Sequence, residues 1–110
     1  MRLHLHADFD RVFKTGLRSA DPVFRVYAFA ASGSEARLGL SVSRSVAARA
    51  TARNRIKRLV RESFRQNRQT LPPVDIVVQA LPVAARTQNP GLRSSLEWHW
   101  QQLVKRCAAS

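Results

Sequence analysis

This chain of 110 residues lacks several features that mark common classes of protein. It has a single cysteine, Cys107, which can neither close an internal disulfide framework nor complete a metal-binding cysteine pattern. No apolar run approaches the roughly 20 residues that a membrane-spanning helix needs. The first residues also lack the apolar core of a secretory signal. These absences predict a cytoplasmic protein that binds no membrane.

Acidic residues are also scarce. Seven Asp and Glu stand against nineteen Lys and Arg, which leaves a formal net charge of +12 at pH 7. The acids are scattered along the chain, and no pair has the spacing expected of a two-metal nuclease. We therefore predict neither a catalytic residue nor a bound metal on this chain. The charge itself predicts a polyanionic partner, because such an excess repels itself in the isolated protein.

Lysine is rare as well, since Lys14, Lys57 and Lys105 are the only ones. Arginine therefore supplies most of the positive charge. Guanidinium groups bind phosphate through two parallel hydrogen bonds and stack on bases. The composition thus favours a nucleic acid as the polyanion.

Apolar residues make up 45% of the chain, enough for one modest core, so we predict a single domain over residues 1–110. Hydrophobic periodicity predicts helices over 8–16, over 46–68 (with a loop up to Thr51) and from Asn89 onward, and strands over 24–29, 38–43 and 75–81. We expect the first two strands to pair antiparallel. The fold class is then α+β, with helices packed on a small mixed sheet in the order αββ(β)αβα. A βαβ crossover would place strands 38–43 and 75–81 parallel.

Some positions are predicted individually. The nearly continuous apolar run over 75–81 indicates a central strand buried on both faces. Tyr27 alternates with Phe24 and Val26, so it belongs on the opposite strand face. The buried face of the last helix is expected to comprise Leu92, Leu96, Trp100, Leu103 and Cys107.

The segment from Arg44 to Arg68 carries nine basic residues and only one acid, Glu62. Four of the basic residues recur every fourth position and form a ridge: Arg53, Lys57, Arg61 and Arg65. A merely solvated helix face usually mixes charges of both signs, so this face favours contact with nucleic acid. The chain has no second helix close by, no Cys/His finger and no heptad repeat. RNA is therefore the better prediction, and no DNA partner is expected.

Two segments make the prediction specific. Leu38-Gly39-Leu40-Ser41-Val42-Ser43-Arg44 is followed, after a short linker, by Arg53-Asn54-Arg55-Ile56-Lys57-Arg58-Leu59-Val60-Arg61-Glu62-Ser63-Phe64-Arg65. Together with a Phe-x-x-x-Phe helix and the strands at 24–27 and 75–78, this pattern resembles the bacterial ribonuclease P protein family over about residues 7–107. The sequence departs from the usual pattern at Ser45 and in the alanine-rich linker 46–52.

The resemblance implies a protein subunit of an endonuclease that processes tRNA, with the catalytic site and its Mg²⁺ on an RNA subunit. It also implies a left-handed βαβ crossover. The partners would be the catalytic RNA and the 5′ leader of precursor tRNA. The catalytic RNA would be bound by Arg44, Arg49, Arg53, Asn54, Arg55, Lys57, Arg58, Arg61 and Arg65. The leader cleft would be lined by Phe9, Phe13, Tyr27, Ser41 and Ser43.

Other interpretations remain open at this point. A ribosomal or ribosome-assembly protein would share the size and charge but would have no role in cleavage. A stand-alone nuclease and a DNA-binding regulator fit less well. At the level of residues, Phe9 and Phe13 could belong to the core instead of a cleft, and Asn54 could cap its helix instead of contacting RNA.

Overall fold

The computed structural model describes residues 17–30 and 35–109. The helix predicted over 8–16, with Phe9 and Phe13, lies outside the described residues. The elements follow in the order β1 (Leu17–Ala20), β2 (Phe24–Ala30), β3 (Arg37–Ser41), α2 (Ala50–Asn67), β4 (Val74–Ala80), α3 (Pro82–Ala85) and α4 (Asn89–Ala109). The α+β class is confirmed, and the short β1 and α3 are additions to the predicted strands and helices.

The four strands form one sheet in the order β1-β2-β4-β3. β2 pairs antiparallel with β1 and β4, and β3 runs parallel to β4 as predicted. The expected antiparallel pair of strands 24–29 and 38–43 is wrong, because β4 lies between them. The apolar run of β4 explains this order, since Val77 faces Tyr27 on one side and Gly39 on the other. A strand that is mostly apolar on both faces is most stable in the centre of the sheet.

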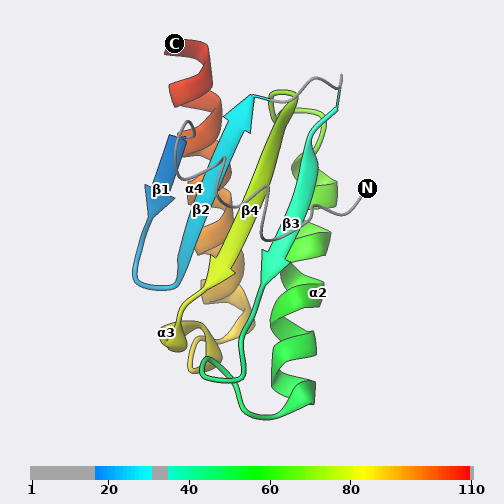
Figure 1. The fold of residues 1–110 in the computed structure, drawn as a ribbon, viewed down its shortest axis with the longest axis vertical. Helices are drawn as coiled ribbons and strands as arrows, with labels where there is room; N and C mark the ends of the chain where they lie inside the picture. The colour runs from blue at the N-terminus through cyan, green and yellow to red at the C-terminus, as the bar shows by residue number, and fades with distance from the viewer. Residues whose placement is uncertain (1–16, 31–34, 110) are drawn as a thin grey trace.

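The crossover from β3 through α2 to β4 is left-handed. In Figure 1 β3 and β4 both run downward, β4 lies to the left of β3, and α2 passes behind the sheet. Nearly all βαβ units have the opposite hand. This confirms the handedness that the family resemblance implies and that periodicity alone could not provide.

The main core lies between the sheet and the two long helices, which cover the same sheet face (Figure 1). α2 contributes Ile56 and Val60, and the predicted face of α4 is buried at Leu92, Leu96, Trp100 and Leu103. The Cys107 side chain is outside the described set. A second, smaller cluster on the opposite sheet face contains Tyr27, Phe29 and Val77. The separation of Tyr27 from Phe24 and Val26 is therefore confirmed.

An ion pair joins the parallel strands on the face away from the helices. Arg37 and Asp75 are register partners, and the Arg37 Nε and Nη2 atoms donate to the two Asp75 carboxylate oxygens at 2.5 Å each. Asp75 is 2% exposed, so its charge has little access to water. The bidentate geometry satisfies this buried carboxylate and helps to set the register of β3 against β4.

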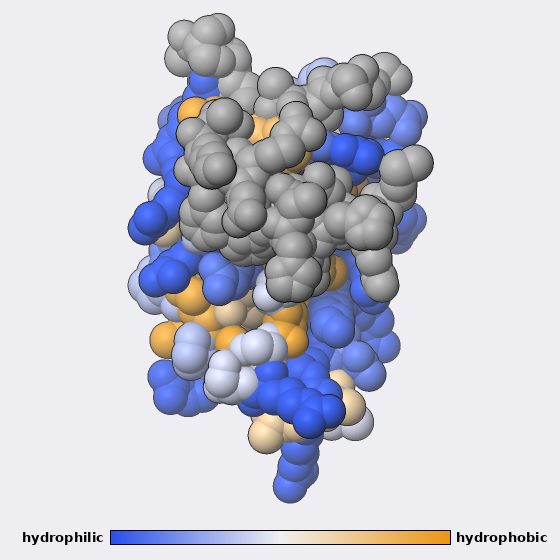
Figure 2. Space-filling model, in the orientation of Figure 1, coloured by the Kyte–Doolittle hydropathy of each residue, from blue (hydrophilic) through white to orange (hydrophobic). Residues whose placement is uncertain are grey.

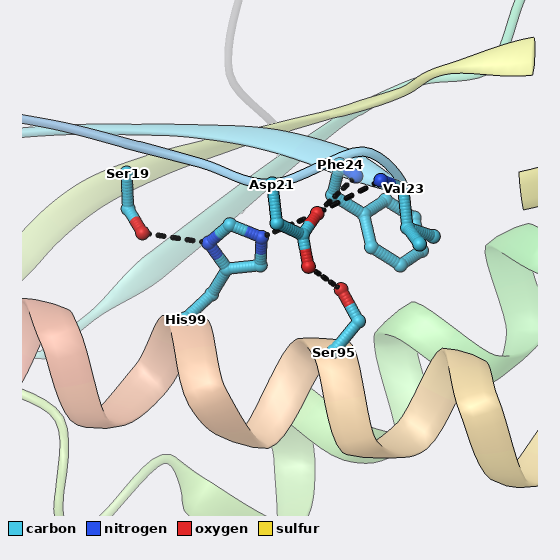
Figure 3. A network of polar contacts seen from close by, with 6 residues as sticks. All are labelled: Ser19, Asp21, Val23, Phe24, Ser95 and His99. Atoms are coloured by element: carbon cyan, nitrogen blue, oxygen red, sulfur yellow. Dashed lines mark hydrogen bonds and ion pairs between the residues drawn. The ribbon is translucent and has the colours of Figure 1, made fainter. Parts of the chain in front are cut away.

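A polar network fastens the β1–β2 turn to α4 (Figure 3). The ring of His99 is fully buried, with its Nδ1 atom 2.7 Å from Ser19 Oγ and its Nε2 atom 3.2 Å from Asp21 Oδ1. The Nε2 contact is close enough for an ion pair but lacks hydrogen-bond direction. Asp21 also accepts a 2.5 Å hydrogen bond from the Ser95 hydroxyl. The network links the edge of the sheet to the last helix through polar side chains.

Candidate nucleic-acid interface

Helix α2 presents two chemically opposite faces. Its buried side consists of Ile56, Leu59, Val60, Ser63 and Phe64. The 3.6-residue period places another set of side chains on the far side of the helix. That set is exposed to solvent and comprises Asn54, Arg58, Arg61 and Arg65. Packing against the sheet therefore orients the arginines outward.

The outward side chains surround a shallow groove of about 830 Å³. Its lining comes from α2 alone and includes Asn54, Arg55, Arg58, Arg61 and Arg65, with Glu62 as its one acid. Within the described part of the chain, none of these arginines forms an ion pair with an acidic side chain. An uncompensated row of guanidinium groups is suited to a polyanion such as a nucleic-acid backbone.

The predicted ridge is only partly exposed. Arg61 and Arg65 lie on the outer face, but Arg53 and Lys57 are half-buried along the flank. Four-residue steps drift around a helix of 3.6 residues per turn, which is why the ridge does not remain on one face. Arg58, which is off the ridge, is exposed in its place.

Arg53 holds the linker before α2. Its Nη1 atom donates hydrogen bonds to the carbonyl oxygens of Ala47 and Ala48, at 2.9 and 2.8 Å. The same linker exposes Arg44 and Arg49, both predicted to contact RNA. Arg53 is therefore partly committed to the protein's own backbone, which sequence reasoning did not foresee.

Arg55 holds a different connection, the one before α4. Its Nη1 atom donates to the side-chain oxygen of Asn89 at 2.7 Å and to the carbonyl of Thr87 at 3.4 Å. The two arginines of the Arg-Asn-Arg motif thus fasten the two loops that flank the exposed face. Asn54, between them, is exposed and does not cap α2, since the N-cap residue is Arg49.

The predicted leader cleft falls on the sheet face that the helices leave uncovered. The alternation of the strands places Tyr27 and Ser41 there, and Ser43 follows β3 as an exposed residue. Tyr27, however, is only 3% exposed, so its ring offers little surface to a base in this structure. The next row across the sheet is more accessible and pairs Arg25, Gln79 and Ser41 in register.

Figure 2 shows this face of the molecule. Hydrophilic surface lies on both sides, and an apolar patch separates the two sides in the lower half of the view. An apolar floor with hydrophilic margins suits single-stranded nucleic acid, because bases can meet the floor and phosphates can meet cationic side chains at the margins.

The described residues contain no cluster of three or more His, Cys, Asp or Glu side chains able to hold a metal ion. None of their helices is both long enough and apolar enough to cross a membrane.

The chain is similar to known proteins over nearly its whole length. The family model described as ribonuclease P matches residues 1–104. The ribonuclease P protein component of Thioalkalivibrio sulfidiphilus is 43% identical over 98% of this chain and 90% of its own. That of Nitrosococcus oceani is 44% identical over 100% of this chain and 92% of its own.

Solved structures extend the similarity to the fold. The Staphylococcus aureus RNase P protein superposes with a TM-score of 0.84 at 34% identity, covering 94% of each chain. The Thermotoga maritima RNase P protein gives a TM-score of 0.81 at 33% identity, covering 93% of this chain and 96% of its own. The family match, the sequence identities and the shared fold show that this chain belongs to the ribonuclease P protein family.

Proposed function

We propose that the exposed face of α2 binds the catalytic RNA of ribonuclease P and that the helix-free face of the sheet receives the 5′ leader of precursor tRNA. Membership of the family makes the chain a protein component of the ribonuclease P endoribonuclease, which processes tRNA. The proposal concerns which surfaces of this chain contact each RNA. It assigns the protein a role in binding and orienting RNA, and it assigns the chemical step to the RNA subunit.

The observation that carries the proposal is the row of arginines without acidic partners on α2. Arg58, Arg61 and Arg65 are exposed along one side of a rigid helix. Each phosphate neutralised by such a cation releases counterions, which makes binding strongly dependent on salt. Asn54 adds a neutral hydrogen-bonding group in the same groove, suited to a ribose hydroxyl or a base edge.

The proposed leader site is supported by a different chemistry. Arg25, Gln79 and Ser41 form a polar row beside the apolar cluster of Tyr27 and Val77. A leader that varies between tRNAs requires contacts that tolerate any base, and contacts from Arg25 and its polar neighbours to the leader's backbone phosphates are of this kind. Ser43 and Arg44 continue the exposed surface from the end of β3 toward α2.

We further propose that the Mg²⁺ of the reaction is held mainly by the RNA subunit. When bound there it activates water and stabilises the charge of the departing oxygen. The contribution of this chain is to bring the two RNAs together through cationic side chains. Action in the cytoplasm remains a prediction from the sequence.

The proposal is tested by the salt dependence of binding to the catalytic RNA of the same organism. The double variant Arg58→Ala/Arg61→Ala should bind more weakly, and its log–log salt slope should be shallower by about two units, one per lost phosphate contact. Lys105→Ala removes one charge at the distant end of α4 and serves as the control, with an unchanged slope expected. A double variant that retained both the affinity and the slope of the natural protein would refute the assignment of α2.

A further inference from the structure

The connection between β4 and α4 presents a second basic surface beside α2. A hollow of about 510 Å³ lies where this connection meets the helix, and its lining includes Arg55, Arg86, Thr87, Gln88 and Asn89. Arg55 also lines the groove of α2, so the two hollows adjoin at this residue. A ligand that follows the α2 groove past Arg55 would therefore reach Arg86.

The shape of this connection is held at several points. Arg55 donates to Asn89 Oδ1 at 2.7 Å, and the Thr87 hydroxyl donates to the carbonyl of Val83 at 2.7 Å. A methyl group built on Gly91 would lie only 2.7 Å from Thr87 Cγ2, so glycine permits the close approach of the connection to α4. These contacts keep Arg86 and Gln88 in one position relative to α2.

The charge of Arg86 is not compensated within the described chain. Its side chain is exposed, and no described residue forms a side-chain hydrogen bond or an ion pair with it. Arg93, one turn into α4, provides the contrast, because it lines a small hollow together with Glu62 and Glu97. Two carboxylates therefore line the hollow of Arg93, although neither forms an ion pair with it, whereas no acid lines the hollow beside Arg86.

We propose that the RNA-binding surface continues from α2 across Arg55 onto the β4–α4 connection. Arg86 contacts a backbone phosphate of the catalytic RNA, and Gln88 donates to a phosphate or ribose oxygen nearby. Arg55 acts as a positioning residue, because its guanidinium is bound to Asn89 and Thr87. This inference rests on the proposed function, since it extends the same interface to the same RNA. An uncompensated guanidinium on a connection held beside α2, next to a row of others, is suited to the closely spaced phosphates of a folded RNA.

The first test measures binding of Arg86→Ala to the catalytic RNA over a range of salt concentrations. The affinity should fall several-fold, and the salt slope should become shallower by about one unit. Arg86→Glu should weaken binding further. Arg93→Ala is the matched control and should leave both quantities unchanged. Because the Arg86 side chain is exposed and has no partner in the described chain, the melting temperature should not change in either Arg86 variant.

The second test separates positioning from a direct contact. Asn89→Ala removes the partner of Arg55 without removing a charge, so it should weaken RNA binding and make the salt slope shallower by releasing Arg86. The same change introduced into Arg86→Ala should have little further effect. A purely structural role for Asn89 would instead weaken binding equally in both backgrounds, and that result would overturn the positioning role.

Other outcomes distinguish this inference from the proposed function. If Arg86→Ala binds normally while Arg58→Ala/Arg61→Ala loses affinity and slope, the extension is wrong and the α2 interface stands. If the α2 double variant also binds normally, the proposed function fails together with the extension. If Arg86→Ala loses affinity only for precursor tRNA, the surface exists but the RNA assigned to it is wrong.

Discussion

At the scale of single residues, the fully buried His99 is the clearest case of chemistry hidden from the sequence. The pattern of the sequence offers no partner for it, yet Ser19 and Asp21 lie on either side of its ring. Burial lowers the pKa of His99, and the nearby Arg106 lowers it further, although Asp21 acts in the opposite direction. Ser19, Asp21 and Ser95 come from segments about 80 residues apart in the chain, so only the fold could reveal the network.

The lowered pKa has a consequence for stability as a function of pH. In the unfolded chain His99 takes up a proton near its ordinary pKa of about 6.5, whereas the folded protein takes it up only at lower pH. The contribution of His99 to the free energy of unfolding is therefore fully present above about pH 6.5. It is lost as the pH falls toward the pKa of His99 in the folded protein. Burial raises the pKa of Asp21, but hydrogen bonds from Ser95, Phe24 and Val23 and the nearby His99 ring outweigh this effect and lower it. The stability that Asp21 contributes is therefore lost only in more acidic solution.

The measurement is the melting temperature of the natural protein and of His99→Gln at pH 7.5 and pH 5.0. Gln keeps an amide that can contact both Ser19 and Asp21 but does not titrate. Between pH 7.5 and pH 5.0, the melting temperature of the natural protein should fall by more than that of the variant. Equal losses would show that His99 does not control the acid sensitivity.

A second residue-scale prediction concerns the leader. Tyr27→Ala would remove a side chain that is 97% buried, so weaker leader binding could simply reflect damage to the sheet. Arg25→Ala is a cleaner test, because Arg25 is exposed on the same face. It should weaken binding of precursor tRNA to the holoenzyme several-fold and leave the binding of mature tRNA unchanged. Arg93→Ala, on a helix behind the sheet, is the control, and equal losses for both tRNAs would remove Arg25 from the leader site.

At the scale of elements, the apolar pattern predicted every described long element to within a few residues, because apolar residues recur at helical spacing in α2 and α4 and form a nearly continuous run in β4. It failed where the pattern is short. β1 and α3 have four residues each, too few for a period to be recognised. The pairing of β2 with β3 was also predicted wrongly, because neighbouring strands in sequence were assumed to be neighbours in the sheet.

Helix α2 also shows how binding chemistry conflicts with helix stability. Its N-cap is Arg49, which makes no side-chain cap hydrogen bond, and its first turn contains no acid. Positive charge near a helix N-terminus opposes the helix dipole, and an arginine at the N-cap leaves backbone N–H groups without a side-chain partner. A helix shaped by stability alone would begin with Ser, Asp or Asn.

Replacing Arg49 with serine tests this conflict. Arg49 has extended backbone angles of φ −82° and ψ 134°, which suit a serine N-cap. Arg49→Ser should raise the free energy of unfolding by roughly 0.5–2 kcal/mol, measured by urea denaturation. If Arg49 contacts the catalytic RNA as the family resemblance implies, the same variant should bind it with a salt slope shallower by about one unit. Greater stability with unchanged RNA binding would exclude Arg49 from the interface.

At the scale of the whole molecule, the sheet separates two proposed RNA surfaces. The helices cover one face of the sheet and leave the opposite face free (Figure 1), so the proposed surface for the catalytic RNA on α2 and the proposed leader site lie on different sides of the sheet. The linker that Arg53 holds connects β3 to α2 and so lies between the two proposed surfaces. The left-handed crossover produces this arrangement. Its handedness was expected only from the family resemblance, because no pattern of residues in the sequence indicates it.

Only part of the candidate site was predicted from the sequence. Charged residues can be recognised directly in a sequence, so the basic α2 segment was identified. Arg58, Arg61 and Arg65 in it are exposed. Hydrogen-bond partners from other segments of the chain cannot be recognised in this way. The bonds of Arg53 to the linker and of Arg55 to Asn89 were therefore missed. Arg86 was missed because a single arginine in a loop has no pattern around it. Spatial proximity to α2 is what gives it significance.

The central claim is most directly tested by cleavage of precursor tRNA at low Mg²⁺ concentration. The catalytic RNA, the protein and their mixture are each assayed, and the mixture is repeated with Arg58→Ala/Arg61→Ala and with Lys105→Ala. The account predicts cleavage at the mature 5′ end only in mixtures, with the double variant needing a several-fold higher protein concentration than the natural protein or Lys105→Ala. Cleavage by the protein alone, or RNA binding that never promotes cleavage, would contradict the account and favour a nuclease or a ribosomal RNA-binding protein respectively.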